Sequence, residues 1–348
     1  MDSEVDSLPN PLIVDSIESS PPRPTLQRLF FGDDGLRAGW SVALFLILAY
    51  LAGRILGAAL NHSHLLHGSQ SGHAHVLTSR NTALGDAVAF ASFAIAAWLV
   101  SLVERRPFAR YGLALRRMPA DFAMGLFWGF TLLSALVGTL YLTHAIAFDG
   151  ALLHGASAFR YGSQWGLAFL FVGLAEEFAT RGFLQYTVAR GVSGITRAID
   201  PTNRRAHLIG FWVAASIFSI SLFMAGHISN PGESFAGILA VGAAGAVFAF
   251  SLYRTGTLWW AIGFHAAWDW AQTFFYGVSD SGLTGQGHLL QTHPVGASLI
   301  SGGAVGPEGS ILALPTLLLA ALIIHFTLPR RAYPLTADQQ KPQPPIAI

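Results

Sequence analysis

Eight long apolar runs decide what this chain can fold into. A helix needs about 20 residues to cross about 30 Å of hydrocarbon, and each run has roughly that length. Only 11% of the 348 residues are charged, whereas soluble globular proteins carry about a quarter. The sequence therefore predicts an all-α fold, a polytopic transmembrane helix bundle of about eight helices. The runs cover residues 38–60, 83–103, 121–146, 164–189, 208–229, 235–253, 257–276 and 310–328.

The basic residues predict how these spans are oriented. Arginines gather in the loops 104–120 and 190–207 and in both terminal tails, whereas the opposite loops carry Arg80 and Arg160 alone. Because Lys and Arg concentrate on the cytoplasmic side, both termini are predicted to be cytoplasmic. Lys341 is the only lysine among 20 basic residues, a bias typical of GC-rich bacterial genomes. We therefore expect a multi-pass protein of the bacterial inner (plasma) membrane.

The composition also excludes several classes of function. The chain has no Cys, which removes thiol nucleophiles and Cys-ligated zinc. Its 20 basic and 19 acidic residues nearly balance, so the sequence favours no nucleic-acid partner. The expected partners are the lipid bilayer and a substrate within it. An ionisable group inside a bilayer costs several kcal/mol unless it is paired or hydrated, so the few intramembrane charges are the informative residues.

Polar and apolar segments divide the chain into five predicted parts. The loop 61–75 carries five histidines; such a tract can bind metal, but an irregular polar loop is the favoured interpretation. The parts are a disordered cytoplasmic N-terminal tail (1–37), N-terminal transmembrane helices (38–163), a core of helices with polar side chains (164–276), a Gly-rich non-cytoplasmic loop (277–309), and a last transmembrane helix with a cytoplasmic tail (310–348).

The fourth span carries two adjacent carboxylates and an arginine. Glu176 and Glu177 point about 100° apart on a helix, so they cannot share one role. Glu177 and Arg181 are spaced i, i+4 and can pair on one face, largely neutralising the arginine. Glu176 is then left without a partner on its own helix, which suits a general base. A buried ion cluster that ties helices together is the alternative interpretation.

Two later spans carry histidines at helical spacing from a second side chain. Phe223 and His227 share one face of the fifth span, and His265 and Asp269 share one face of the seventh. The Asp269 carboxylate can orient the His265 imidazole, or both can face a common ligand. Counted along straight helices, His227 lies about 28 Å from the start of its span and His265 about 12 Å from the start of its own. The two histidines can meet only if a helix is shifted or tilted around a water-filled cavity.

These three motifs, in this order, resemble those of the CPBP family of intramembrane proteases. That family contains CAAX proteases and bacteriocin-processing (Abi) proteins and is related to the CAAX prenyl endopeptidase. The motifs are Glu-Glu-x-x-x-Arg at 176–181, Phe-x-x-x-His at 223–227 and His-x-x-x-Asp at 265–269. The resemblance covers 164–276 and makes this segment the expected catalytic core. The prenyl endopeptidase has Asn where this chain has Asp269, and Asp also occurs there among bacterial members.

The resemblance implies hydrolysis of a peptide bond in a membrane-associated or hydrophobic substrate, either CAAX-type prenylated or bacteriocin-like. Carried over residue by residue, Glu176 would be the general base and His227 would hold and polarise the water. His265 and Asp269 would stabilise the oxyanion. The Glu177–Arg181 pair, with Phe223, would support the site.

Alternatives remain open at this point. The side chains of Glu176, His227, His265 and Asp269 are all competent zinc ligands. The chain lacks His-Glu-x-x-His, so the usual helical zinc-protease arrangement is missing, and a site without a metal cofactor is favoured. The same intramembrane His265 and Asp269 would also suit a divalent-cation transporter. A third possibility is a family member that acts as a non-proteolytic scaffold or immunity factor.

Overall fold

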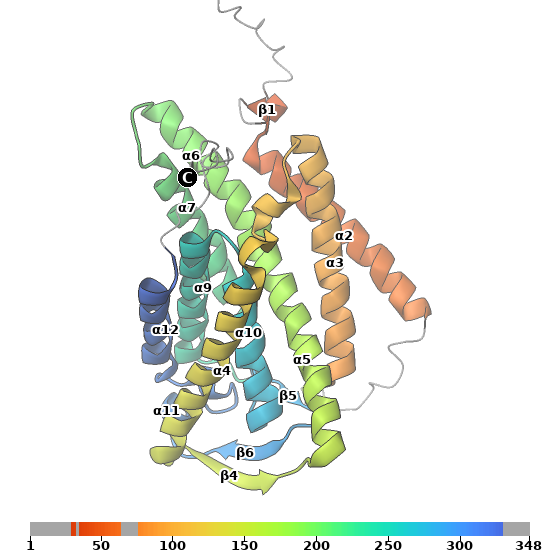
Figure 1. The fold of residues 1–348 in the computed structure, drawn as a ribbon, viewed down its shortest axis with the longest axis vertical. Coiled ribbons are helices and arrows are strands. Elements are labelled where there is room, and N and C mark those ends of the chain that lie inside the picture. Colours follow the sequence, from red (N-terminus) through yellow and green to blue (C-terminus); the bar gives the residue numbers. More distant parts are fainter. Residues whose placement is uncertain (1–28, 33–34, 64–75, 330–348) are drawn as a thin grey trace, which may run out of the picture.

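The structure is a computed structural model that describes residues 29–32, 35–63 and 76–329 (Figure 1). Most of the N-terminal tail, most of the His-rich loop and the C-terminal tail lie outside the described residues, so the predictions made for them are not addressed. In the described part helices cover most of each of the eight predicted spans, although α4 (Met118–Leu142) ends before the predicted span 121–146 does, which runs on into strand β4 (Ile146–Ala151). The predicted all-α helical bundle is confirmed.

The helices form a bundle whose members run mainly along its long axis (Figure 1). Among the described residues, five helices are long and apolar enough to cross a membrane: α2, α3, α4, the joined α7–α8 and α9. Exposed apolar side chains such as Ile55 of α2 and Phe326 of α12 cover the outside of the bundle, as lipid contact requires. The bounds are α2 Ala38–His62, α3 Ser79–Glu104, α4 Met118–Leu142, α5 Gly155–Glu177, α6 Tyr186–Ile199, α7 Ala206–Ala214, α8 Phe223–His227, α9 Phe235–Thr255, α10 Trp259–Trp270, α11 Ser298–Ser301 and α12 Ala313–Thr327.

Three of the predicted spans contain π-helical segments. Phe178–Gln185 joins α5 to α6, Ala215–Leu222 joins α7 to α8, and Ala271–Tyr276 extends α10. The first segment overlaps the motif at 176–181, the second directly precedes the motif at 223–227, and the third begins two residues after the motif at 265–269. Such segments are rare and frequently occur at functional sites, because the wider turn changes which side chains share a face.

Glycines bring the motif-bearing helices into close contact with their neighbours. A Cβ atom added at Gly129 of α4 would clash with the Phe264 carbonyl oxygen of α10. One added at Gly245 of α9 would clash with the Ser219 carbonyl oxygen. Small residues allow this approach of two backbones in a membrane, where packing rather than water drives helix association.

The predicted Gly-rich loop 277–309 is folded against the lower end of the bundle in Figure 1. Strand β6 (Leu290–Pro294) pairs antiparallel with β4 (Ile146–Ala151), and β5 (Thr284–Gly285) pairs in parallel with β3 (Val76–Leu77). A further short hairpin, β1 (Phe31–Gly32) with β2 (Gly35–Leu36), lies before α2. The loop is therefore held to two distant parts of the chain, and this places its side chains beside the helical core.

Candidate active site

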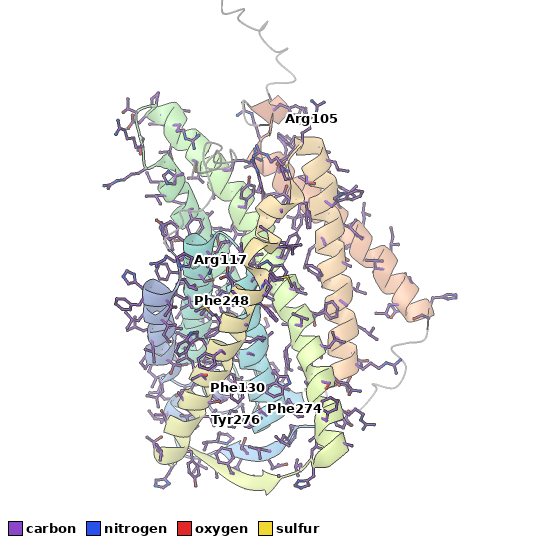
Figure 2. The ribbon with its side chains drawn as sticks, viewed as in Figure 1. Arg105, Arg117, Phe130, Phe248, Phe274 and Tyr276 are labelled. Carbon is purple, nitrogen blue, oxygen red and sulfur yellow. The ribbon has the colours of Figure 1, made fainter. Side chains whose placement is uncertain are left out.

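A cavity of about 600 Å³ opens inside the bundle between α3, α5, α8, α9, α10 and α12. The loop 277–309 supplies part of its wall. The four predicted catalytic side chains all line it: Glu176, His227, His265 and Asp269. Phe248, labelled in Figure 2, lies in the middle part of the bundle and forms another part of the wall. The structure thus brings together residues that lie almost a hundred positions apart in the sequence.

Glu177 is fully buried and holds two positively charged or polar partners at once. Its Oε1 accepts a hydrogen bond from the Arg181 guanidinium at 2.7 Å, the i, i+4 pair expected on this helix. The same oxygen lies 3.0 Å from Nδ1 of His265, which comes from α10. A carboxylate can only accept, so His265 Nδ1 carries the hydrogen of this bond. Glu177 therefore fixes the orientation of the His265 ring.

Arg181 is held between two aromatic rings as well as by its carboxylate. Its guanidinium carbon lies 4.5 Å from the centre of the Phe223 ring and 5.1 Å from the centre of the Phe248 ring. Both distances allow cation–π attraction, which is stronger where water is excluded. The side chain is fully buried and does not line the cavity. Arg181 supports the site from behind rather than meeting a substrate.

His265 presents its other nitrogen to the cavity between two carboxylates. Nε2 lies 3.4 Å from Asp269 Oδ2 and 3.9 Å from Glu176 Oε2. The ring stacks on Phe248, with 5.4 Å between ring centres. The sequence suggested that Asp269 orients this imidazole, but the hydrogen bond that orients the ring comes from Glu177. Asp269 instead flanks the nitrogen that faces the cavity.

Glu176 is the most accessible carboxylate of the motif. Its side chain is 38% exposed, whereas that of Glu177, the next residue, is fully buried. The two side chains leave the helix in different directions, as expected from their spacing. The Glu176 carboxylate therefore reaches the water of the cavity, and Glu177 reaches only protein.

His227 faces the same cavity, and its tautomer follows from one contact. Nδ1 lies 2.8 Å from the Phe223 carbonyl oxygen. Because a carbonyl accepts and cannot donate, Nδ1 carries a hydrogen, and the neutral ring leaves Nε2 as an acceptor. The Phe223 ring contacts both imidazoles, with ring centres 4.8 Å from His227 and 6.4 Å from His265.

The depth mismatch expected between His227 and His265 is absent, because the helices do not start at one level. In Figure 1, α6 and α7 extend above the upper end of α9. The chain leaves α9 at that lower level and begins α10 at Trp259, already deep in the bundle. His265, six residues further on, lines the same cavity as His227, and the Phe223 ring lies against both imidazoles.

Sequence reasoning missed eight polar side chains of the cavity wall, of which Thr78, Thr82 and Asn230 are uncharged neighbours of the five named below. Asp86 is an acidic residue inside an apolar run, and an intramembrane carboxylate by itself indicates a functional site. The loop residues are brought in by strand pairing and give no local signal. The other five missed residues are Asn81 and Asp86 of α3, and Asp280, Ser281 and Glu308 of the loop 277–309.

Two of these loop carboxylates are buried and lie outside the spans. Asp280 Oδ2 accepts a hydrogen bond from the Thr273 hydroxyl at 3.0 Å. Glu308 Oε1 accepts from the Ser281 amide at 2.6 Å and from its hydroxyl at 2.9 Å. Burial, with the nearby Asp269 carboxylate, raises the pKa of Asp280 well above its usual value. Burial also raises the pKa of Glu308.

The side chains proposed as zinc ligands do not gather as a ligand set. Within residues 29–32, 35–63 and 76–329, no three His, Asp or Glu side chains lie in an arrangement that could hold a metal ion. His265 uses Nδ1 for Glu177, and its Nε2 lies 3.4 Å from Asp269 Oδ2 and 3.9 Å from Glu176 Oε2. Two atoms that each lie about 2.2 Å from one zinc ion can be this far apart, so the missing group of three ligands in the described residues, rather than these distances, argues against zinc.

The bundle, with its long apolar helices, is that of an integral membrane protein. Residues 158–271 match the family model of the Type II CAAX prenyl endopeptidase Rce1-like proteins. The match spans about a third of the chain, contains all three motifs, and confirms the resemblance found from them. No curated protein and no solved structure matches the chain significantly. The family supports an intramembrane endopeptidase with a hydrophobic substrate in general terms.

Proposed function

We propose that this protein is an intramembrane endopeptidase that hydrolyses a peptide bond with a water molecule activated by Glu176. The observation that carries the proposal is the shared cavity, into which α5, α8 and α10 bring Glu176, His227, His265 and Asp269. Uncatalysed amide hydrolysis lacks a general base, hydrogen-bond acceptors that orient the water, and hydrogen-bond donors for the oxyanion.

In the first step, water donates one hydrogen to the Glu176 carboxylate and its oxygen attacks the scissile carbonyl carbon. The neutral His227 ring supports this step, because its Nε2 can accept the second hydrogen of the water and fix its direction. Two acceptors on one water orient its remaining lone pair towards the carbonyl. General-base catalysis of this kind contributes about 10²–10⁴-fold.

The tetrahedral intermediate carries a negative oxygen that needs donors. With Nδ1 held by Glu177, His265 offers an Nε2 hydrogen to this oxygen only as the doubly protonated ring. Asp269 donates only when protonated. The C–N bond then breaks, and the carboxylic acid formed on Glu176 returns its proton to the leaving amine. Glu177, Arg181 and Phe223 take no part in bond making; they hold the His265 and His227 rings in place.

The substrate is proposed to be a membrane-associated or hydrophobic peptide, of the CAAX-prenylated or bacteriocin-like type. Apolar side chains from several helices form much of the rest of the cavity wall and suit an apolar substrate segment. They include Phe169 and Val172 of α5, Val241 of α9 and Trp268 of α10. The expected location is a bacterial inner membrane with both termini cytoplasmic.

Comparative proteomics tests this proposal in cells. Cells that produce the wild-type protein are compared with cells that produce Glu176→Gln at equal abundance. We expect at least one membrane-associated cleavage product that is lost in the variant. If the Glu176→Gln protein restores every phenotype of a deletion strain, the non-proteolytic scaffold or immunity role is favoured instead. The transporter alternative predicts metal uptake into vesicles that depends on His265 and Asp269.

A further inference from the structure

The cavity wall contributed by α3 lies outside the family match and carries an acidic side chain that the hydrolytic mechanism does not use. Asp86 of α3 faces the cavity across from α5 and interacts electrostatically with Glu176 and His265. His265 is already flanked by Asp269 and hydrogen-bonded by Glu177. Glu176 has the same charge sign as Asp86 and so cannot neutralise it.

Asp86 also has no partner of its own. Across the described ranges, which omit 64–75 and both tails, its carboxylate makes no hydrogen bond and no ion pair. An unpaired carboxylate within a membrane-spanning segment is costly, and chains keep one where it serves binding or catalysis. Because no side chain of the described ranges pairs with Asp86 directly, its carboxylate can pair with a group that arrives from outside the protein.

The charge of the whole cavity points in the same direction. Its described wall contains no Lys or Arg, and Arg181 is buried behind it. Five acidic side chains line the space, those of Asp86, Glu176, Asp269, Asp280 and Glu308, together with His227 and His265. The raised pKa values of Asp280 and Glu308 reduce their share of the negative charge, so Asp86 and Glu176 contribute most to it. Low-dielectric walls concentrate such a field, so a cation gains and an anion loses on entry.

A polar stripe on α3 leads to Asp86. Thr78, Thr82 and Asp86 are spaced i, i+4, i+8 and line the cavity with Asn81. The rest of the helix is apolar enough to cross a membrane. The stripe offers hydroxyl and amide oxygens along the way to the carboxylate, which would stabilise an ammonium or guanidinium group as it loses water.

We propose that Asp86 is a specificity-determining residue that pairs with a positively charged side chain of the substrate, Lys or Arg, near the scissile bond. The inference rests on the proposed endopeptidase function and narrows its substrate class to hydrophobic peptides with a basic residue.

Binding in the Glu176→Gln background tests this pairing without requiring cleavage. The protein is placed in nanodiscs and titrated with labelled peptides, each an apolar segment of about 20 residues with one central Lys, norleucine or Glu. Energy transfer from labelled protein to labelled peptide reports binding, and empty nanodiscs correct for partition into lipid. We expect the Lys peptide to bind about tenfold more tightly than the norleucine peptide.

Substitutions at Asp86 test whether this residue causes the preference for the Lys peptide. Asp86→Asn should bring the Lys-to-norleucine ratio close to one, and Asp86→Lys should turn the preference towards the Glu peptide. Asp149→Asn is the matched control, because Asp149 is a half-exposed strand residue outside the cavity wall and should keep the ratio. Equal binding of Lys and norleucine peptides, or a preference that survives Asp86→Asn, overturns the proposal. If charge-selective binding is intact but the wild-type protein cleaves nothing, the proposed proteolysis fails and this pairing stands.

Discussion

Replacing Glu177 should damage the protein in two separable ways, because this one carboxylate holds both Arg181 and His265. Glu177→Leu leaves the fully buried Arg181 guanidinium without its 2.7 Å partner. Breaking a buried ion pair by removing one member costs about 3–5 kcal/mol, mostly from the uncompensated charge that stays inside. The cation–π contacts with Phe223 and Phe248 remain and reduce this loss by about 1–2 kcal/mol.

The double variant Glu177→Leu/Arg181→Met separates stability from positioning. Replacing a whole buried pair by apolar side chains of similar volume is often neutral, so most of the lost free energy of unfolding should return. Activity should not return, because His265 Nδ1 still lacks its acceptor and the ring is free to turn. A misplaced catalytic group costs about 100-fold in rate. Arg181→Met alone keeps the Glu177–His265 hydrogen bond and should retain more activity than either Glu177→Leu or the double variant.

The assay combines denaturant unfolding in detergent with peptide cleavage in proteoliposomes. Asp149→Asn is the control, because it breaks a half-exposed pair with His293 and should cost less than about 1 kcal/mol. Wild-type cleavage by the double variant would refute the claim that Glu177 positions His265. Wild-type stability of Glu177→Leu would refute the claim that it neutralises Arg181.

Three further predictions follow from the helix contacts, the loop and the donor set. Gly129→Ala should lower the free energy of unfolding by about 1–3 kcal/mol, because the new Cβ meets the Phe264 carbonyl oxygen, whereas Gly138→Ala meets nothing within 4 Å and should leave stability unchanged or raise it. The folded-state pKa values of Asp280 and Glu308 are raised, so their contribution to stability is complete below the unfolded pKa values and is lost as pH rises through the folded ones. Raising the pH should therefore speed up amide hydrogen exchange within 277–309 by more than the intrinsic effect of pH on exchange. The increase should be smaller in Asp280→Asn. Exchange rates that follow the intrinsic pH effect alone would contradict this prediction. Incubation with a chelator followed by desalting should leave cleavage intact, and loss of activity that zinc restores would show that a metal is needed.

Most of the architecture can be predicted from the sequence, because membrane insertion of a helix depends on the apolarity and length of its own segment. Each of the eight apolar runs lies mostly in helices of the structure, and the i, i+4 spacing is enough to place Glu177 beside Arg181. The three motifs also indicate one common site. None of this needs knowledge of how distant segments pack.

Other parts of the site could not be derived in the same way. A π-helical segment leaves no recognisable pattern in an apolar sequence. The rotation of Arg181 relative to Glu176 about the helix axis therefore could not be predicted from the sequence. The hydrogen bond from His265 to Glu177 depends on how deep α10 begins, which is set by the packing of α9 and α4. Asp280 and Glu308 enter the wall because strands of the loop pair with Ile146–Ala151 and Val76–Leu77, contacts between residues far apart in the chain.

The central claim is tested most directly by the rate of peptide-bond hydrolysis in proteoliposomes that contain only the purified protein and a cleavable hydrophobic peptide. Wild-type protein, Glu176→Gln and Glu176→Asp are compared at equal folded amounts, with mass spectrometry of the products in H₂¹⁸O. The account predicts one ¹⁸O atom in the new carboxyl group after a single turnover, a rate for Glu176→Gln lower by about 100-fold or more, and partial activity for Glu176→Asp. Hydrolysis by Glu176→Gln at the wild-type rate would contradict it.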